Sequence, residues 1–418
     1  MKYGTVGVTT LILTTALYAC THLPTGISQS PPPGQNRNGA GFRVAGTRPS
    51  DVKAIIGQPL GTRAFALTTK TPMGIQVIAH GLRNPWALAF LPSGQIFVTE
   101  KPGAMRIVTR AGTISDPIEG VPQVASGGDA GLLDVILDPG FYSNRLLYFT
   151  YVEPRDGGRG VAVAKARLSE DLKRLENLKV LIHVEPAVEP TAHYGSRMLF
   201  DKQGKILVTM GERFFDPMRG QAQNLNSLMG KILRINTDGT PAPDNPFAHT
   251  PGALPEIWSY GMRNPQGMTF HPQTGELWEL EPGPRGGDEV NVIQPGKNYG
   301  WPITSYGTDN PGMEQPIYYW DPAIAPSGAT FYSGSLIPEW KNNLFVAGLA
   351  GEHLVRLVLK GHTVIGEERL LLDQHQRMRD VQQGPDGALW VVTDNIDGRL
   401  LRIAPKTSRF PAPNEPVF

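Results

Sequence analysis

Residues 267–283 read GMTFHPQTGELWELEPG, a short apolar strand, a turn built on Pro and Gly, and a second apolar strand. The same phrase recurs at uneven intervals of roughly 45 to 70 residues, as in β-propeller blades joined by loops of variable length. A single β-sandwich does not explain so many equivalent phrases. The sequence therefore predicts an all-β fold, a six-bladed β-propeller, with one copy of the phrase starting at each of Ala87, Asp134, Arg197, Gly267, Gly328 and Asp380.

Further apolar runs and the overall composition agree with this fold. The chain holds 48 Gly and 38 Pro in 418 residues, and its apolar segments stay short, which is typical of a turn-rich all-β protein. Lys and Arg number 39 against 38 Asp and Glu, and this balance argues against nucleic acid as a partner. Third strands of blades are expected near Met105, Val161, Lys231, Leu354 and Arg399.

The N-terminus has the pattern of a bacterial lipoprotein signal. An apolar run from Val6 to Ala16 leads to Ala19 and then to Cys20, the single cysteine, which has no internal disulfide partner. We expect a signal peptide over residues 1–20 and lipidation of Cys20, so that the protein is periplasmic and tethered to a membrane. Because Thr21 follows, the tether is similar to those of outer-membrane lipoproteins. An ordinary signal peptide with an incidental Cys, or a short membrane anchor, is the alternative.

Three further regions follow the signal. Residues 21–71 are rich in Pro and Gly and read as a tether, part of which is ordered if the apolar run 52–67 docks on the main domain. Residues 72–405 are expected to form the propeller. Residues 406–418 are expected to be a C-terminal tail.

In a propeller, the residues just before each first strand lie near the central channel. At these positions the chain carries arginines, amides, a carboxylate and one imidazole. Such a lining suits an anionic ligand, and a polycarboxylate would fit it. The positions are Arg83, Asn84, Trp86, Gly128, Asp129, Gly131, His193, Ser196, Arg263, Asn264, Gln266, Ser327, Arg377 and Arg379.

Two of these positions have chemistry of their own. His193 is a candidate general base, because imidazole titrates near neutral pH, although a solvated loop histidine has the same local sequence. Arg377 and Arg379 flank one residue in an extended stretch, so their side chains emerge on one face and form a fork for carboxylates. A pair of surface arginines is the alternative for them.

The loop after residue 281 is a candidate cation site. Gly283 and Pro284 present rigid carbonyl oxygens, which suit calcium, although a Gly-Pro pair is also an ordinary turn. Asp288 and Glu289 either brace this loop or bind a second cation. The segment Gly211–Arg213, in contrast, has no chemistry that the pattern assigns.

Seven motifs in order resemble one family. The chain from about residue 76 to 405 is similar to the soluble pyrroloquinoline quinone (PQQ)-dependent aldose sugar dehydrogenases, which include soluble glucose dehydrogenase. The resemblance implies a six-bladed propeller with PQQ and calcium in a cleft at one end. The motifs are GLRNPWALAFLPSG, AGLLDVILDPGF, HYGSRMLFD, EIWSYGMRNPQG, EPGPRGGDEVN, KNYGWP and RMRDVQQGPDG.

The resemblance also implies residue roles. His193 takes the proton from the sugar C1 hydroxyl while hydride passes to C5 of the quinone. The carbonyls of Gly283 and Pro284 hold the calcium, and Glu289 and Tyr299 match positions of a second, structural calcium. Cofactor-binding roles fall on Asp129, Arg263, Asn264, Arg377 and Arg379.

Two positions depart from the family. Asp129 stands where the family has Gln, and Ala350 stands where some relatives have Lys.

The expected activity is oxidation of aldoses at C1 to lactones, with electrons passing to an unidentified acceptor. A calcium-dependent lactonase, or a lipid-tethered propeller that binds glycans or a protein partner without catalysis, are the alternatives.

Overall fold

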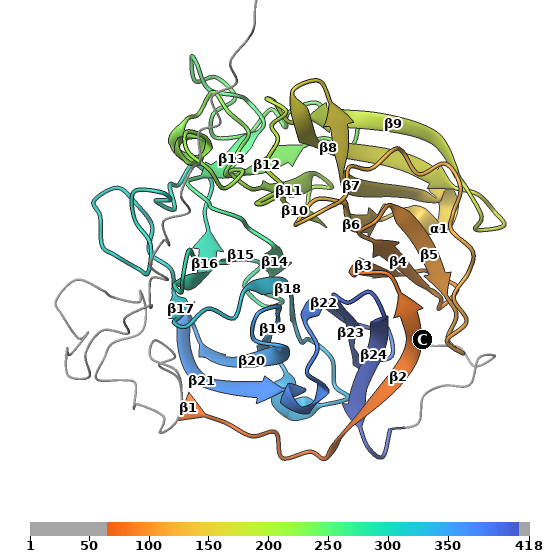
Figure 1. Cartoon of the computed structure of the whole chain (residues 1–418). Helices are drawn as coiled ribbons and strands as arrows, with labels where there is room; N and C mark the ends of the chain where they lie inside the picture. The colour runs from red at the N-terminus through yellow and green to blue at the C-terminus, as the bar shows by residue number, and fades with distance from the viewer. Residues whose placement is uncertain (1–64, 409–418) are drawn as a thin grey trace, which may run out of the picture. The chain divides into compact units, whose positions relative to one another are not determined.

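The structure is a computed structural model that describes residues 65–408. In this range six sheets surround a common centre, and the predicted six-bladed β-propeller is confirmed (Figure 1). Every predicted copy of the repeated phrase supplies the innermost strand and the next strand of one blade. The innermost strands contact one another in a closed ring in the order β3, β6, β10, β14, β18 and β22.

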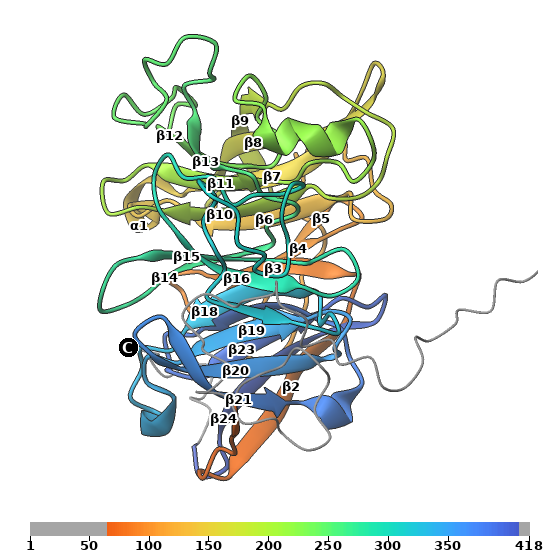
Figure 2. The ribbon, with the colours of Figure 1, turned by 90° about the vertical axis from the view of Figure 1, so that its left-hand side faces the viewer.

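The first three blades follow the chain without interruption. Figure 2 turns the ring by 90°, with blades two and three in its upper half. Blade one is β3 (Pro85–Phe90), β4 (Ile96–Glu100) and β5 (Ala104–Val108); blade two is β6 (Leu132–Leu137), β7 (Leu146–Arg155), β8 (Gly158–Leu168) and β9 (Leu175–His183); blade three is β10 (Gly195–Phe200), β11 (Ile206–Met210), β12 (Lys231–Ile235) and β13 (Ile257–Tyr260).

The last three blades complete the ring. Blade four is β14 (Gly267–Phe270), β15 (Leu277–Glu281), β16 (Asp288–Ile293) and β17 (Tyr318–Trp320); blade five is β18 (Pro326–Phe331), β19 (Leu344–Gly348), β20 (His353–Lys360) and β21 (Thr363–Leu370); blade six is β22 (Met378–Gln383), β23 (Leu389–Thr393) and β24 (Gly398–Pro405). Short helices interrupt the loops: α1 (Phe141–Asn144) and the 3₁₀ turns η2 (Met218–Gln223), η3 (Pro338–Trp340) and η4 (Leu372–Gln374).

Two N-terminal strands join blades formed late in the chain. Strand β2 (Met73–Leu82) pairs antiparallel with β24 and becomes the outer strand of blade six, which closes the ring. Strand β1 (Phe65–Ala66) pairs in parallel with β21 at the edge of blade five. Thr69, in the predicted tether, donates its hydroxyl to Glu368 over 2.6 Å.

The second strand of most blades is buried along its whole length, because it lies between sheets packed on both faces. This explains why β11, β19 and β23 are mostly apolar, whereas β4 and β15 also bury Glu100, Glu279 and Glu281. Aromatic rings fill the space between blades: Trp278 meets Phe331 edge to face at 5.2 Å, and Phe90 meets Trp390 at 5.7 Å.

The turn between first and second strands repeats as the sequence does. Gly94, Gly204, Gly275 and Gly387 close these turns at φ of 79°, 73°, 74° and 75°. A residue with a Cβ is disfavoured in this left-handed region, which is why the repeated phrase ends its turn on glycine.

The remaining predictions on the termini fall outside the described residues. These are the signal peptide, lipidation of Cys20, the tether up to residue 64 and the tail from residue 409. Within residues 65–408, no helix has the length and apolar character that a membrane-spanning helix needs.

Candidate active site

The loops before the first strands and the ends of the second strands meet at one end of the channel. Four second strands have an acidic residue at their last position or within two residues after it: Glu100, Glu212, Glu281 and Asp394. Each carboxylate accepts hydrogen bonds from residues that precede a first strand. The acidic strand ends therefore hold the predicted channel residues in place.

His193 is buried, and its ring is fixed on both sides. Its Nδ1 lies 3.1 Å from Oε1 of Glu212, and its ring meets Phe214 edge to face at 4.9 Å. Its backbone N–H donates to Oδ2 of Asp129 over 3.2 Å, at a φ of 55° that few non-glycine residues adopt. An ionised carboxylate only accepts, so Nδ1 carries the proton and Nε2 is left as the basic nitrogen.

Glu212 is a functional residue that the sequence interpretation missed. It is fully buried, and the oxygen that faces His193 also accepts a hydrogen bond from Nε1 of Trp301 over 3.1 Å. Its other oxygen accepts from the backbone N–H of Phe214. The signal that points to Glu212 is an acidic residue near the end of a second strand: Glu212 lies two residues after β11, and Glu281 is the last residue of β15.

Arg263 and Asn264 are held against Glu281. The backbone N–H groups of both residues donate to Oε2 of Glu281, over 2.6 and 2.9 Å. Burial raises the pKa of Glu281 to about 7, although these hydrogen bonds oppose the shift. Nε of Arg263 is buried without a hydrogen-bond partner, and the guanidinium lies 5.2 Å from the ring of Trp301. An unsatisfied buried donor of this kind suits an acceptor brought by a ligand.

Arg377 and Arg379 do form a fork, and the protein already places a carboxylate in it. Oδ2 of Asp394 lies 2.5 Å from Nη2 of Arg379 and 3.6 Å from Nη2 of Arg377. Oδ1 of Asp394 accepts from Asn84 over 3.1 Å, and Lys101 lies 3.7 Å from it. Arg379 is buried and also donates to Gln266, whereas the side chain of Arg377 is 46% exposed. The sequence interpretation missed Asp394 and Lys101.

The residues predicted to bind calcium line one small cavity of about 10 Å³, which is room for about one ion or water. Gly283, Pro284, Glu289 and Tyr299 all contribute to its wall, together with Glu281. The hydroxyl of Tyr299 is already bonded to Val292 and Gln294, so any contribution to a metal falls to its backbone carbonyl.

Asp288 and Glu289 differ in what they contact. Asp288 accepts backbone hydrogen bonds from Gly283, Ile324 and Ala325, which is the bracing role. Glu289 faces the cavity, and burial raises its pKa to about 8. Both begin strand β16 and do not lie in the loop itself.

Oxygen acceptors beside this cavity lack donors. Glu279 and Asn291 face each other across β15 and β16, and Oε1 of the first and Oδ1 of the second are buried without a hydrogen-bond partner. Buried acceptors of this kind fit a hard cation with oxygen ligands. Among residues 65–408, no three His, Cys, Asp or Glu side chains are grouped so as to hold a metal, so backbone carbonyls would have to contribute.

Comparison with known proteins identifies the family of this chain. The Glucose / Sorbosone dehydrogenase family matches residues 82–402. The chain is 39% identical over 349 residues to the aldose sugar dehydrogenase YliI of Escherichia coli (strain K12), across 80% of this chain and 93% of that protein.

Solved structures agree. A glucose dehydrogenase structure, 43% identical, covers 79% of this chain and 99% of its own with a TM-score of 0.76. The PQQ-bound form of an aldose sugar dehydrogenase from Streptomyces coelicolor is 30% identical and covers 81% of this chain and 99% of its own, with a TM-score of 0.68. The resemblance predicted from the motifs is thereby confirmed, and the chain belongs to the Glucose / Sorbosone dehydrogenase family.

Proposed function

We propose that this protein oxidises aldose sugars at C1 to lactones, using PQQ and calcium, and passes the electrons to an acceptor that is not yet identified. The observation that carries the proposal is the buried pair of His193 and Glu212, 3.1 Å apart, beside Arg263 and the oxygen-lined cavity. Membership of a sugar dehydrogenase family and a PQQ-bound relative support it.

The proton chemistry falls to His193. With Nδ1–H donated to Glu212, the free Nε2 accepts the proton of the C1 hydroxyl as the C1–H bond breaks. Glu212 stabilises the imidazolium that results, and the edge of Phe214 limits how the ring can turn. PQQ, when bound, supplies the two-electron acceptor that takes the hydride from C1.

The residues around His193 fit the cofactor and the ion. Arg263, Arg377 and Arg379, with the amide of Asn264, would bind the carboxylates and carbonyls of PQQ. Unpartnered Nε atoms on Arg263 and Arg379 support this assignment. The carbonyls of Gly283 and Pro284 would hold calcium. Glu289 and the carbonyl of Tyr299 line the same cavity, which has room for about one ion, so they would contribute to this calcium site and not to a second one.

Asp129 differs chemically from the Gln of the family, because a carboxylate repels an anionic cofactor. In this chain its Oδ2 accepts the backbone N–H of His193. We therefore propose that Asp129 acts on the cofactor site by fixing the loop that carries the base.

The location is a separate proposal that rests on residues 1–20. We propose a periplasmic lipoprotein that is anchored to the outer membrane through Cys20. Palmitate labelling that persists in a Cys20→Ser variant would rule this out.

The test of the activity is reconstitution. Protein lacking residues 1–20 is loaded with PQQ and calcium, and dye reduction by a panel of aldoses is followed. We expect turnover that requires PQQ, is lost in EGTA, and falls about 10²- to 10⁴-fold in His193→Ala, the usual contribution of a positioned base. His249→Ala, at an exposed loop position, is the matched control.

Two outcomes would overturn the proposal. One is full turnover in His193→Ala. The other is wild-type protein that neither binds PQQ nor reduces dye with any aldose, which would leave a tethered propeller with a binding role, or a lactonase to be sought with lactone substrates.

A further inference from the structure

The cluster around Asp394, at the proposed cofactor end of the channel, holds more cations than carboxylates. Three cations, Lys101, Arg377 and Arg379, lie at 3.7, 3.6 and 2.5 Å from the single carboxylate of Asp394. The carboxylate of Asp129 also interacts with Lys101 and raises the pKa of its ammonium. A partly buried cluster with surplus positive charge is unfavourable by itself and is relieved by an anion.

Lys101 comes from a different part of the ring than the arginines. It follows β4 in blade one, whereas Arg377, Arg379 and Asp394 belong to blade six. The side chain is only 17% exposed, and burial lowers the pKa of its ammonium, with Arg379 and Arg377 adding to the effect. A lysine that is desolvated and repelled by two arginines has a strong electrostatic reason to contact an anion.

The backbone fixes where Lys101 can reach. Its N–H donates to the carbonyl of Asn84 and its carbonyl accepts from Leu132, each over 3.0 Å. Its stem also packs on Gly131, where an added Cβ would lie 2.4 Å from Cγ of Lys101. These contacts join blades one and two beside the channel and hold the ammonium toward Asp394.

We propose that Lys101 is a further cofactor-binding residue, which contacts a carboxylate of PQQ and offsets the negative charge of Asp129. This inference rests on the proposed function. It accounts for both departures from the family: Asp129 adds a negative charge, Ala350 lacks a positive one, and Lys101 supplies a cation between blades one and six.

Equilibrium binding of PQQ to the cofactor-free protein tests the role without turnover. Quenching of tryptophan fluorescence is followed, since Trp301 stacks on Arg263 and Trp86 on Arg379. We expect the Kd to rise about tenfold to a hundredfold in Lys101→Gln, as when a charge-assisted hydrogen bond is lost. Lys101→Arg keeps the charge and should bind within about threefold of wild type.

Two further variants separate charge from structure. Asp129→Asn should bind PQQ more tightly than wild type, and in the Lys101→Gln background it should recover part of the lost affinity. Lys341→Gln makes the same change at an exposed position and should leave the Kd unaltered. The dependence of Kd on salt should also be less steep in Lys101→Gln, because one ionic contact is gone.

The outcomes are distinguishable. If wild type binds PQQ and Lys101→Gln binds it equally well with an unchanged thermal midpoint, the role of Lys101 is overturned and the proposed function stands. If wild type does not bind PQQ, both fall. Should Lys101→Gln be unfolded, Lys101→Met and Lys101→Arg are compared, and equal Kd values for these two would also reject the charge-based role.

Discussion

Glu212 sets the geometry of the proposed base at the scale of single residues. Its Oε1 lies 3.1 Å from Nδ1 of His193 and 3.1 Å from Nε1 of Trp301, so one buried oxygen orients both rings. A base oriented in this way keeps one tautomer and directs Nε2 at the substrate. The carboxylate therefore acts through His193 and makes no contact with the sugar.

We predict that Glu212→Gln lowers kcat about tenfold to a hundredfold, the range typical of losing the partner that orients a histidine. The amide also ends the stabilisation of the imidazolium, so His193 loses its proton more easily and the acidic limb of the pH profile of kcat should shift to lower pH. The Kd for PQQ should not change. The measurement is the pH dependence of kcat in protein loaded with PQQ and calcium.

Glu256→Gln provides a control for the loss of a glutamate outside the site. An unchanged pH profile in Glu212→Gln, or an equal loss of PQQ affinity and kcat, would show that Glu212 has only a structural role.

At the scale of single elements, strand β2 decides whether the ring closes. Its pairing with β24 runs from Met73 opposite Pro405 to Leu82 opposite Gly398, and Gln76 accepts a hydrogen bond from Arg402 over 3.0 Å. Without β2, the outer edge of β24 would present unpaired backbone groups to solvent. Blade six would then be incomplete, and its first strand carries Arg379.

We predict that the free energy of unfolding of a chain beginning at Arg83 falls by at least about 2 kcal/mol, because the burial of the Leu82 side chain is lost. We also expect this chain to aggregate through the open edge of β24. A chain beginning at Pro72 keeps β2 and should remain monomeric. Size-exclusion chromatography and urea unfolding compare the two. Equal stability and equal monomer content would show that the ring does not depend on this strand.

The elements also show which local patterns can be predicted. All six first strands and the glycine turns follow from the repeated phrase of short apolar runs and turn residues. Strand β16 does not, because Asp288 and Glu289 at its start are acidic and follow two glycines, a composition typical of a loop. Cross-strand pairing with β15 stabilises it as a strand.

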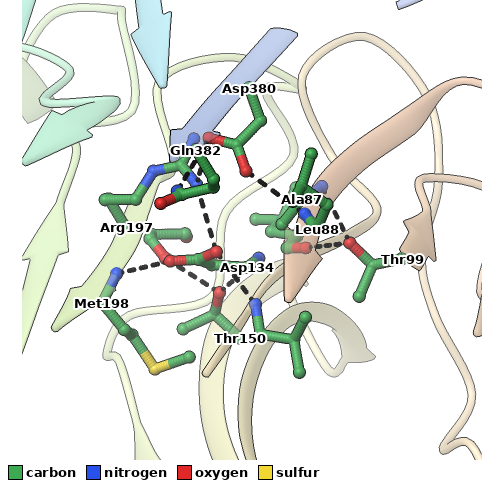
Figure 3. Close-up of polar contacts among 12 residues, drawn as sticks. Ala87, Leu88, Thr99, Asp134, Thr150, Arg197, Met198, Asp380 and Gln382 are labelled. Atoms are coloured by element: carbon green, nitrogen blue, oxygen red, sulfur yellow. Dashed lines mark hydrogen bonds and ion pairs between the residues drawn. The ribbon is translucent and has the colours of Figure 1, made fainter. Parts of the chain in front are cut away.

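At the scale of the whole molecule, an ion network ties blades together across the channel (Figure 3). Nη1 of Arg197 in blade three lies 3.1 Å from Asp134 in blade two and 3.2 Å from Asp380 in blade six. The guanidinium also stacks on Trp86 at 4.3 Å. This network fixes the positions of the inner strands that carry the site.

The network should make stability depend on pH. Burial raises the pKa of Asp134 from 3.8 to about 6, although Arg197 opposes the shift. The folded state therefore holds this proton more tightly than the unfolded state, so the contribution is full below about pH 3.8 and is lost as pH rises to about 6. The change amounts to about 3 kcal/mol.

We predict that Asp134→Asn, which cannot titrate, gains stability relative to wild type as pH rises through this window. Urea unfolding of both proteins at several pH values between 3.8 and 7 measures the difference. A difference that stays constant across these pH values would contradict the prediction. Asp238→Asn, at an exposed turn, is the control for a surface carboxylate.

The amino-acid sequence alone determined the number of blades, their first two strands, and His193, Gly283 and the arginines as residues of one end of the channel. Short apolar runs and turn glycines are local signals, and the family motifs identify the site residues. Only the tertiary structure brought Glu212 to His193 and Lys101 to Asp394. The pair of His193 and Glu212 joins a loop to the end of a strand. The pair of Lys101 and Asp394 joins blade one to blade six, and these two blades become neighbours when the ring closes through β2. Which charged residues share a buried site depends on the loops that contact each other across the channel. A local sequence pattern cannot predict these contacts, because they join distant parts of the chain.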